Sequence, residues 1–185
     1  MARVPSMMIP LNSRAPEFIL PEVVKESTIS LQQIRGKTAT VIVFICNHCP
    51  FVKHINPQLI QLAHDYVNKG VQVIAISSND VRQYPEDGPQ NMKNVAEQLK
   101  YPFPYLYDET QKVAKAYNAA CTPDFFVYDP NLLLTYRGQL DDSRPGNEIP
   151  LSGKDIRAAL DSMIKGDPVN AIQKPGIGCS IKWKK

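Results

Sequence analysis

The sequence lacks several features that mark specialised classes of protein. No apolar run approaches the roughly 18 residues that a membrane-spanning helix needs. Basic residues exceed acidic ones only slightly, 21 against 18, and this net charge of +3 does not favour nucleic acid or an anionic membrane as a partner. The 43% of hydrophobic and 21% of charged residues are ordinary globular values, and no repeats occur. These values exclude a disordered, collagen-like or coiled-coil chain.

Cysteine is also scarce, because four cysteines among 185 residues do not make a disulfide scaffold. The length predicts one domain, residues 1–185, which buries enough surface to fold without a disulfide or a metal. The first 18 residues contain no apolar core of a secretion signal, so we expect a cytoplasmic protein. Thiols stay reduced in the cytoplasm, so a close cysteine pair there favours catalysis or metal binding over a structural bridge.

Strand and helix patterns alternate along the chain. Residues 40–45 are a continuous run of β-branched and aromatic side chains, which predicts a strand buried on both faces. Apolar residues at helical spacing follow over residues 52–66. We further expect an extended arm at 1–17, short strands at 18–20 and 28–31, strands at 71–77, 101–107, 124–128 and 132–136, helices at 92–99, 109–117 and 155–165, and an irregular tail at 167–185. This order predicts an α/β fold with a mixed central sheet flanked by helices.

Two cysteines, Cys46 and Cys49, stand between the buried strand and the following helix. A Cys-x-x-Cys near a strand–helix–strand pattern is a redox signal, and the free amides of a helix N-terminus stabilise a thiolate. We therefore expect Cys46 to be the exposed, attacking thiol and Cys49, one helical turn further on, to resolve the mixed disulfide. His48, when protonated, would stabilise the thiolate and make the disulfide a stronger oxidant.

Metal binding by this pair would need more ligands, because structural zinc usually takes four. The remaining histidines and cysteines form no second close pair, and no histidine lies beyond His64. We therefore expect no metal and no cofactor other than a redox-active Cys46–Cys49 disulfide. A metal-binding or redox-sensing protein without turnover remains an alternative.

The motifs together resemble the thioredoxin superfamily, and within it the peroxiredoxin-like, AhpC/TSA-type branch. The resemblance rests on APEFIL at 15–20, the segment 30–37 that begins SL and ends GK, CNHCP at 46–50 and Thr-Pro at 122–123. YPED at 84–87 and GCSIKW at 178–183 resemble an uncharacterised thioredoxin-like group with the CNHCP motif. The resemblance covers essentially the whole chain. It implies a thioredoxin-like fold with an N-terminal β-hairpin and a βα insertion over about residues 71–106.

The resemblance also implies roles for residues outside the cysteine pair. Thr122 and Pro123 would be joined by a cis bond facing the redox pair, with backbone beside them free to pair with a substrate. Apart from the resemblance, the positions of Cys121 and Cys179 in the chain make them candidate accessory thiols, and Cys179 would be a second resolving thiol if the tail folds back over the site. The polar loop at 141–144 would lie near the end of the fold that carries the redox pair.

Departures from the family patterns bear on the reaction. Peroxiredoxins carry a Thr or Ser three residues before the reactive Cys, and a distant Arg. When Cys49 is aligned with that reactive Cys, Cys46 replaces the Thr, and the Arg position falls on or beside Pro123. These losses favour a thiol–disulfide oxidoreductase over the alternative, an antioxidant thiol peroxidase.

Thioredoxins also bury an acid that accepts a proton, but no carboxylate lies in residues 40–45. The proton of Cys49 would then pass to water, His48 or an acid that the sequence does not reveal. We expect a protein or small-molecule disulfide as substrate and an unidentified electron donor as partner, with no nucleic acid and no membrane.

Overall fold

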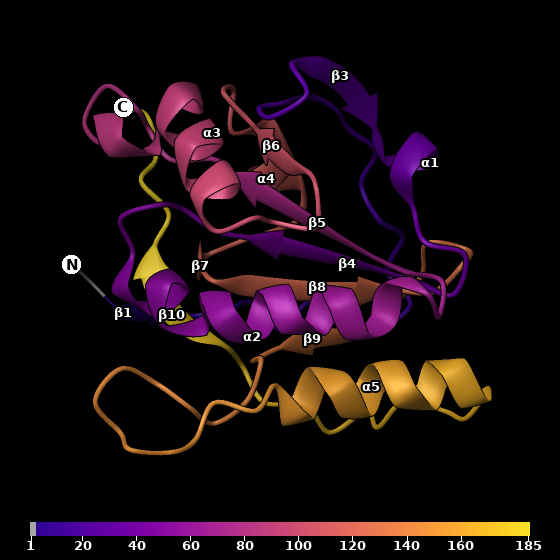
Figure 1. Ribbon diagram of the computed structural model, residues 1–185. Helices are drawn as coiled ribbons and strands as arrows, with labels where there is room; N and C mark the ends of the chain where they lie inside the picture. Colours follow the sequence, from indigo (N-terminus) through magenta and orange to yellow (C-terminus); the bar gives the residue numbers. More distant parts are fainter. Residues whose placement is uncertain (1–2) are drawn as a thin grey trace.

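The computed structural model describes residues 3–185, and its centre is a seven-stranded sheet in the order β3-β2-β6-β5-β4-β8-β9 (Figure 1). Its strands are β2 (Ile19–Glu22), β3 (Ser27–Ser30), β4 (Ala39–Phe44), β5 (Val71–Ser77), β6 (Tyr105–Tyr107), β8 (Asp124–Tyr128) and β9 (Leu134–Gly138). β4 pairs in parallel with β5 and antiparallel with β8, so the predicted α/β fold with a mixed sheet is confirmed.

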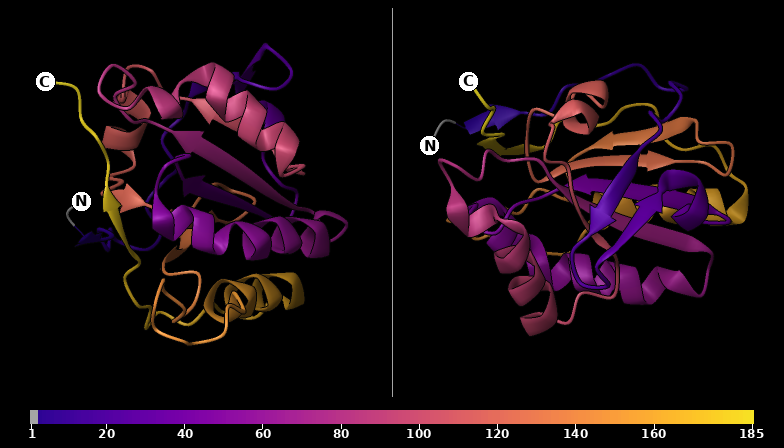
Figure 2. Two further views of the ribbon diagram at one scale, coloured as in Figure 1. Left: turned by 60° about the vertical axis from the view of Figure 1, so that its left-hand side comes forward. Right: turned by 90° about the horizontal axis from the view of Figure 1, so that it is seen from above.

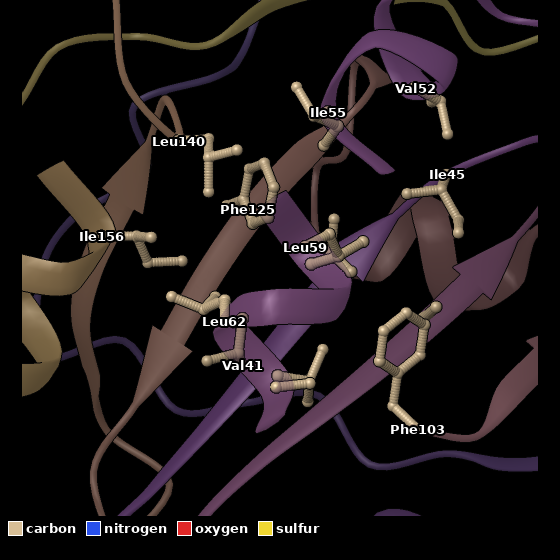
Figure 3. Close-up of a cluster of buried hydrophobic side chains, with 14 of the residues drawn as sticks. Val41, Ile45, Val52, Ile55, Leu59, Leu62, Phe103, Phe125, Leu140 and Ile156 are labelled. Atoms are coloured by element: carbon tan, nitrogen blue, oxygen red, sulfur yellow. The ribbon is translucent and has the colours of Figure 1, made fainter. Parts of the chain in front are cut away.

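The helices are α1 (Leu31–Ile34), α2 (Pro50–Val67), α3 (Pro89–Gln98), α4 (Lys112–Ala116) and α5 (Lys154–Lys165), and η1 (Pro85–Asp87) is a 3₁₀ turn. α2 and α5 run along the same face of the sheet (Figures 1 and 2). Val41 of β4 and Leu59 of α2 belong to the apolar cluster on that face, together with Ile156 of α5 (Figure 3). Every residue of β4 is buried, as its unbroken apolar run predicts. The end of β4, which leads into residues 46–50, is therefore fixed in position by packing on both faces of the sheet.

The segment that precedes β4 forms the predicted hairpin, because β2 and β3 pair antiparallel. Within residues 71–106, β5 is a central strand of the sheet beside β4, and η1 and α3 connect it to β6. Among residues 3–185, no helix is both long enough and apolar enough to cross a membrane.

The two ends of the described chain meet in a second, three-stranded sheet. Its order is β1-β10-β7, from β1 (Arg3–Pro5), β10 (Ile177–Ser180) and β7 (Cys121–Thr122). The arm expected at 1–17 thus contains a strand, and the tail expected to be irregular at 167–185 contains another. Figure 2 shows β10 crossing the end of the molecule where α2 begins. The tail is ordered there because its backbone finds hydrogen-bonding partners on both sides.

Candidate redox site

The motif at 46–50 connects the end of β4 to the start of α2. Cys49 is the residue that caps the helix, Pro50 is its first residue, and Lys53 N–H donates to the Cys49 carbonyl at 3.0 Å. Proline suits this position because the first helical amides have no partner within the helix. Cys49 therefore stands at the helix N-terminus and not one turn inside it, which corrects the expectation from spacing.

Both thiols of the motif are buried. Cys46 is 1% exposed and Cys49 is 0% exposed, so the expectation of an exposed Cys46 is wrong. Their burial results from segments that lie far away in sequence. Thr122 of β7 contacts both sulfurs, and β10 packs against α2. Neither sulfur is therefore accessible to solvent in this structure.

Thr122 contacts both cysteines. Its hydroxyl oxygen lies 3.4 Å from Cys46 Sγ, and its carbonyl oxygen lies 3.2 Å from Cys49 Sγ. The bond between Thr122 and Pro123 is cis, the geometry that the family resemblance implies. The structure thus brings Cys46, Cys49, Thr122 and Pro123 together in one cluster.

The backbone of Thr122, in contrast, is not free for a substrate. Strand β10 lies against it in antiparallel register, with Cys179 opposite Thr122 and Ser180 opposite Cys121. A Cβ added to Gly178 would overlap the Thr122 carbonyl, so glycine permits the close approach of the two strands. This corrects the expectation of an open backbone edge, because the chain's own tail occupies it.

A carboxylate that the sequence did not single out lies beside the motif. Asp87 is 0% exposed, and its Oδ2 lies 2.6 Å from His48 Nδ1. Asn79 Nδ2 donates to the same oxygen at 2.8 Å, and Asn47 N–H donates to Oδ1 at 2.8 Å. Asp87 therefore tethers the η1 turn to the residues between the two cysteines. The only signal in the sequence was the YPED motif, and its spacing did not point to His48.

The Asp87 contact governs the charge of His48. The hydrogen bond that the imidazole donates to the Asp87 carboxylate raises the pKa of His48, and this effect outweighs partial burial, which lowers it. Burial raises the pKa of Asp87, but hydrogen bonds from His48 and Asn79 outweigh it and lower that pKa overall. The imidazole also stacks on Tyr84 with ring centroids 5.0 Å apart. The pair thus favours a protonated imidazole beside an ionised carboxylate.

The two thiols differ in acidity. A hydrogen bond from the Cys46 thiol lowers the pKa of Cys49 to about 4, against the opposing effect of burial. Cys179, Thr122 and the amide of Val52 also stabilise the Cys49 thiolate. The pKa of Cys46 is raised by the same hydrogen bond to Cys49, by burial and by the charge of Asp87. Negative charge is therefore favoured on Cys49, and not on Cys46 as expected from the sequence.

The other two cysteines have different surroundings. Cys179 is 3% exposed and belongs to the same buried cluster as Cys46 and Cys49, and burial and the neighbouring Cys49 raise its pKa. Cys121 Sγ donates instead to the Pro123 carbonyl at 3.5 Å, and burial raises its pKa. The structure therefore adds Cys179 to the cysteine pair and leaves Cys121 bonded to its own loop.

A second buried carboxylate, Asp124, follows Pro123. Its Oδ2 accepts from Ala120 N–H at 3.0 Å, which holds the loop leading into β7. Burial raises the pKa of Asp124 to about 7. The hydrogen bond from Ala120 helps to hold the backbone that carries Thr122.

The loop at 141–144 lies near the site, as the resemblance implies. Ser143 Oγ is 2.8 Å from His54 Nε2 on α2, and Asp141 accepts from Ser143 N–H at 2.8 Å. Arg144 lines a small apolar pocket that also includes Phe51 and Pro123. The loop thus forms one wall beside the proline of the site.

One group of side chains has the composition of a metal site. Cys46, His48 and Asp87 each place one ligand atom within 4.8 Å of the others. His48 Nδ1 is already hydrogen-bonded to Asp87, so the carboxylate acts toward the imidazole as a partner that orients the ring. Structural zinc usually takes four ligands, one more than this group supplies.

Known proteins resemble this chain in sequence and in structure. The model of the AhpC/TSA family matches residues 11–137. A crystal structure of an uncharacterised conserved protein from Geobacillus kaustophilus is 61% identical, with a TM-score of 0.98, covering 100% of this chain and 97% of that one. A hypothetical protein from Sinorhizobium meliloti 1021 is 44% identical, with a TM-score of 0.95 and coverage of 97% and 98%. No curated protein matches the sequence.

More distant structures share the fold. A putative thiol:disulfide interchange protein from Chlorobium tepidum is 21% identical, with a TM-score of 0.58, covering 70% of this chain and 84% of that one. At this identity the likeness concerns the thioredoxin-like fold. The family model spans more than half of the chain, and the sheet and helices have the thioredoxin-like arrangement. The chain therefore belongs to the AhpC/TSA family and has a thioredoxin-like fold.

Proposed function

We propose that this protein is a thiol–disulfide oxidoreductase that works through the Cys46–Cys49 dithiol. The observation that carries the proposal is the placement of two buried thiols around Thr122, at 3.4 Å and 3.2 Å from its oxygens, with Cys49 at a helix N-terminus. The fold shared with a protein described as a thiol:disulfide interchange protein supports it. We place the reaction in the cytoplasm, with a protein or small-molecule disulfide as substrate.

The mechanism starts from the Cys49 thiolate. Cys49 attacks one sulfur of the substrate disulfide and displaces the other as a thiolate, which leaves a mixed disulfide on Cys49. The Cys46 thiol then gives up its proton and attacks the Cys49 sulfur, so the second substrate thiolate leaves. The substrate gains two electrons and two protons, and the protein retains a Cys46–Cys49 disulfide. An electron donor must then reduce that disulfide.

This order reverses the one expected from the sequence, in which Cys46 attacks. The reversal follows from the donors around Cys49, which include the Val52 amide and the Cys46 thiol. His48 contributes positive charge near the pair, and Asp87 holds its ring in place. Thr122 contacts both sulfurs and would orient a bound substrate together with Pro123.

Reduction of a small aromatic disulfide by the pre-reduced protein tests the proposal. We expect Cys49→Ser to fall to the uncatalysed rate, whereas Cys46→Ser should still react at Cys49. If Cys46→Ser fell to the uncatalysed rate and Cys49→Ser still reacted, Cys46 would be the attacking thiol. Wild-type rates in both variants would refute a dithiol oxidoreductase.

A thiol peroxidase is the second candidate, because Cys49 precedes Pro50 at a helix start within the AhpC/TSA match. Cys49 Sγ hydrogen-bonds to the Thr122 carbonyl, and the arginine position of the peroxiredoxin pattern falls on or beside Pro123. Stopped-flow oxidation by hydrogen peroxide distinguishes the candidates. Oxidation of Cys49 much faster than that of a free thiol would favour the peroxidase.

The group of Cys46, His48 and Asp87 keeps metal binding without turnover as a third candidate. Metal analysis of the purified protein tests it. A stoichiometric zinc or copper ion that is lost in Cys46→Ser, in a protein that reduces no disulfide, would favour this function over the other two.

A further inference from the structure

We propose that Cys179 is a third redox thiol of this protein, which resolves a disulfide formed between Cys49 and a bound substrate. The inference rests on the proposed function, because Cys49 must first react with a disulfide. It adds a residue from the last strand, 130 positions after Cys49 along the chain, to a reaction that otherwise uses the motif alone.

The position of Cys179 is built by strand pairing. Cys179 lies opposite Thr122 in the β10–β7 register, and the Thr122 carbonyl is 3.2 Å from Cys49 Sγ. Strand β10 also packs against α2, so Cys179 lies beside the start of that helix, where Cys49 stands. Cys46, Cys49 and Cys179 all belong to one buried cluster, with Cys179 3% exposed. Three thiols thus meet at the start of α2.

The tail also occupies the place expected for a substrate backbone. The family resemblance implies that a bound peptide pairs beside Thr122 and Pro123, and β10 pairs there instead. The absence of a side chain at Gly178 lets β10 approach the Thr122 carbonyl closely. Cys179 therefore meets Cys49 much as a cysteine of a bound peptide would, and this geometry favours exchange between the two sulfurs.

The resolving step balances without a further oxidant. Cys49 has already displaced one thiolate from the substrate disulfide and carries the other half as a mixed disulfide. The Cys179 thiol gives up its proton, its sulfur attacks Cys49 Sγ, and the bond between Cys49 and the substrate breaks. The departing substrate thiolate takes up a proton. A Cys49–Cys179 disulfide forms, and the substrate disulfide has received two electrons from the two thiols.

Cys121 supplies a matched control. It is buried, like Cys179, and lies in β7 next to Thr122, but its thiol donates to the Pro123 carbonyl. Across the strand pair it faces Ser180. If proximity to the site were sufficient for a thiol to resolve the mixed disulfide on Cys49, Cys121 and Cys179 would behave alike.

The test uses the full chain with Cys46→Ser, so that Cys46 cannot resolve the mixed disulfide. The reduced variant is mixed with 5,5′-dithiobis(2-nitrobenzoate), and released thionitrobenzoate is followed by absorbance. We expect a first equivalent from attack by Cys49 and a second from attack by Cys179, with a Cys49–Cys179 peptide found by mass spectrometry. Adding Cys179→Ser should remove the second equivalent and leave a stable adduct on Cys49. Adding Cys121→Ser should leave both releases unchanged.

The outcomes separate this inference from the proposed function. A stable adduct on Cys49 in the Cys46→Ser protein, with no linked Cys49–Cys179 peptide, overturns the inference and leaves the oxidoreductase proposal intact. No reaction at Cys49 overturns both. Peptide mapping of the partially oxidised wild-type protein does not depend on whether a variant folds. In that experiment we expect a Cys49–Cys179 disulfide in addition to the Cys46–Cys49 disulfide. Finding Cys46–Cys49 alone at every degree of oxidation also overturns the inference.

Discussion

His48 Nδ1 and Asp87 Oδ2 lie 2.6 Å apart although the two residues are separated by 39 positions in the sequence. The carboxylate is buried, and its other oxygen accepts from the Asn47 amide. Asp87 therefore does two things at once: it fixes the backbone between the two cysteines and it favours the protonated imidazole. The electrostatics of the cysteine pair consequently depend on a loop outside the motif.

Replacing this carboxylate by an amide tests its effect on His48. Asp87→Asn keeps the size of the side chain but removes its charge, so the pKa of His48 should fall. The loss of charge-assisted hydrogen bonds at a buried site should also destabilise the protein by about 1–3 kcal/mol. NMR titration of the imidazole measures the pKa, and urea unfolding measures the stability. Glu86→Gln, next in sequence, is the control and should have the smaller effect. An unchanged His48 pKa in Asp87→Asn contradicts the assignment.

The same pair predicts a pH window for stability. The pKa of His48 is raised above its ordinary value of 6.5, so its stabilisation is complete below that pH and is lost as pH rises through the raised pKa. The pKa of Asp87 is lowered from 3.8, so its stabilisation is present above that pH and is lost as pH falls through the lowered pKa. The free-energy difference between wild type and His48→Gln should therefore be largest between these two ordinary values. A difference that does not vary from acid to alkaline pH would refute the pairing.

The surroundings of Cys49 predict the direction of the reduction potential. Groups that stabilise a thiolate stabilise the reduced protein, which makes the disulfide more oxidising. Equilibration with glutathione should give a potential less negative than the roughly −270 mV of thioredoxin. His48→Ala should move it to a more negative value, while His54→Ala, whose ring bonds to Ser143, should change it little. A potential at or below that of thioredoxin, unaffected by His48→Ala, contradicts this prediction.

The contact of the tail with the site predicts the effect of a single added methyl group. In Gly178→Ala the new Cβ would overlap the Thr122 carbonyl, so β10 must move away from β7. Such overpacking should cost about 1–3 kcal/mol and should speed alkylation of Cys49 and Cys179 by iodoacetamide. Ser180→Ala, in the same strand, should leave both properties near wild type. Equal alkylation rates in Gly178→Ala and wild type would mean that β10 does not cover the thiols.

Much of the fold follows from local patterns. The unbroken apolar run in β4 permits only a strand that is covered on both faces, and Val52, Ile55, Leu59 and Leu62 give α2 an apolar face to cover it. Cys46 and Cys49 stand between these two elements, so the position of the motif was determined by the sequence. The hairpin of β2 and β3 was predictable for the same reason, since neighbouring segments need only a short turn to pair.

The chemistry of the site was decided by tertiary structure. Burial of both cysteines, the contact of His48 with Asp87, and the pairing of Cys179 with Thr122 all join residues that are far apart in the chain. Periodicity and spacing describe neighbours along the sequence, so they could not show which carboxylate or which thiol would reach the motif. The sequence by itself determined where the two cysteines stand. Only the folded chain decided which of them carries the charge, and which other groups act on it, because acidity depends on the donors and charges that folding brings within contact.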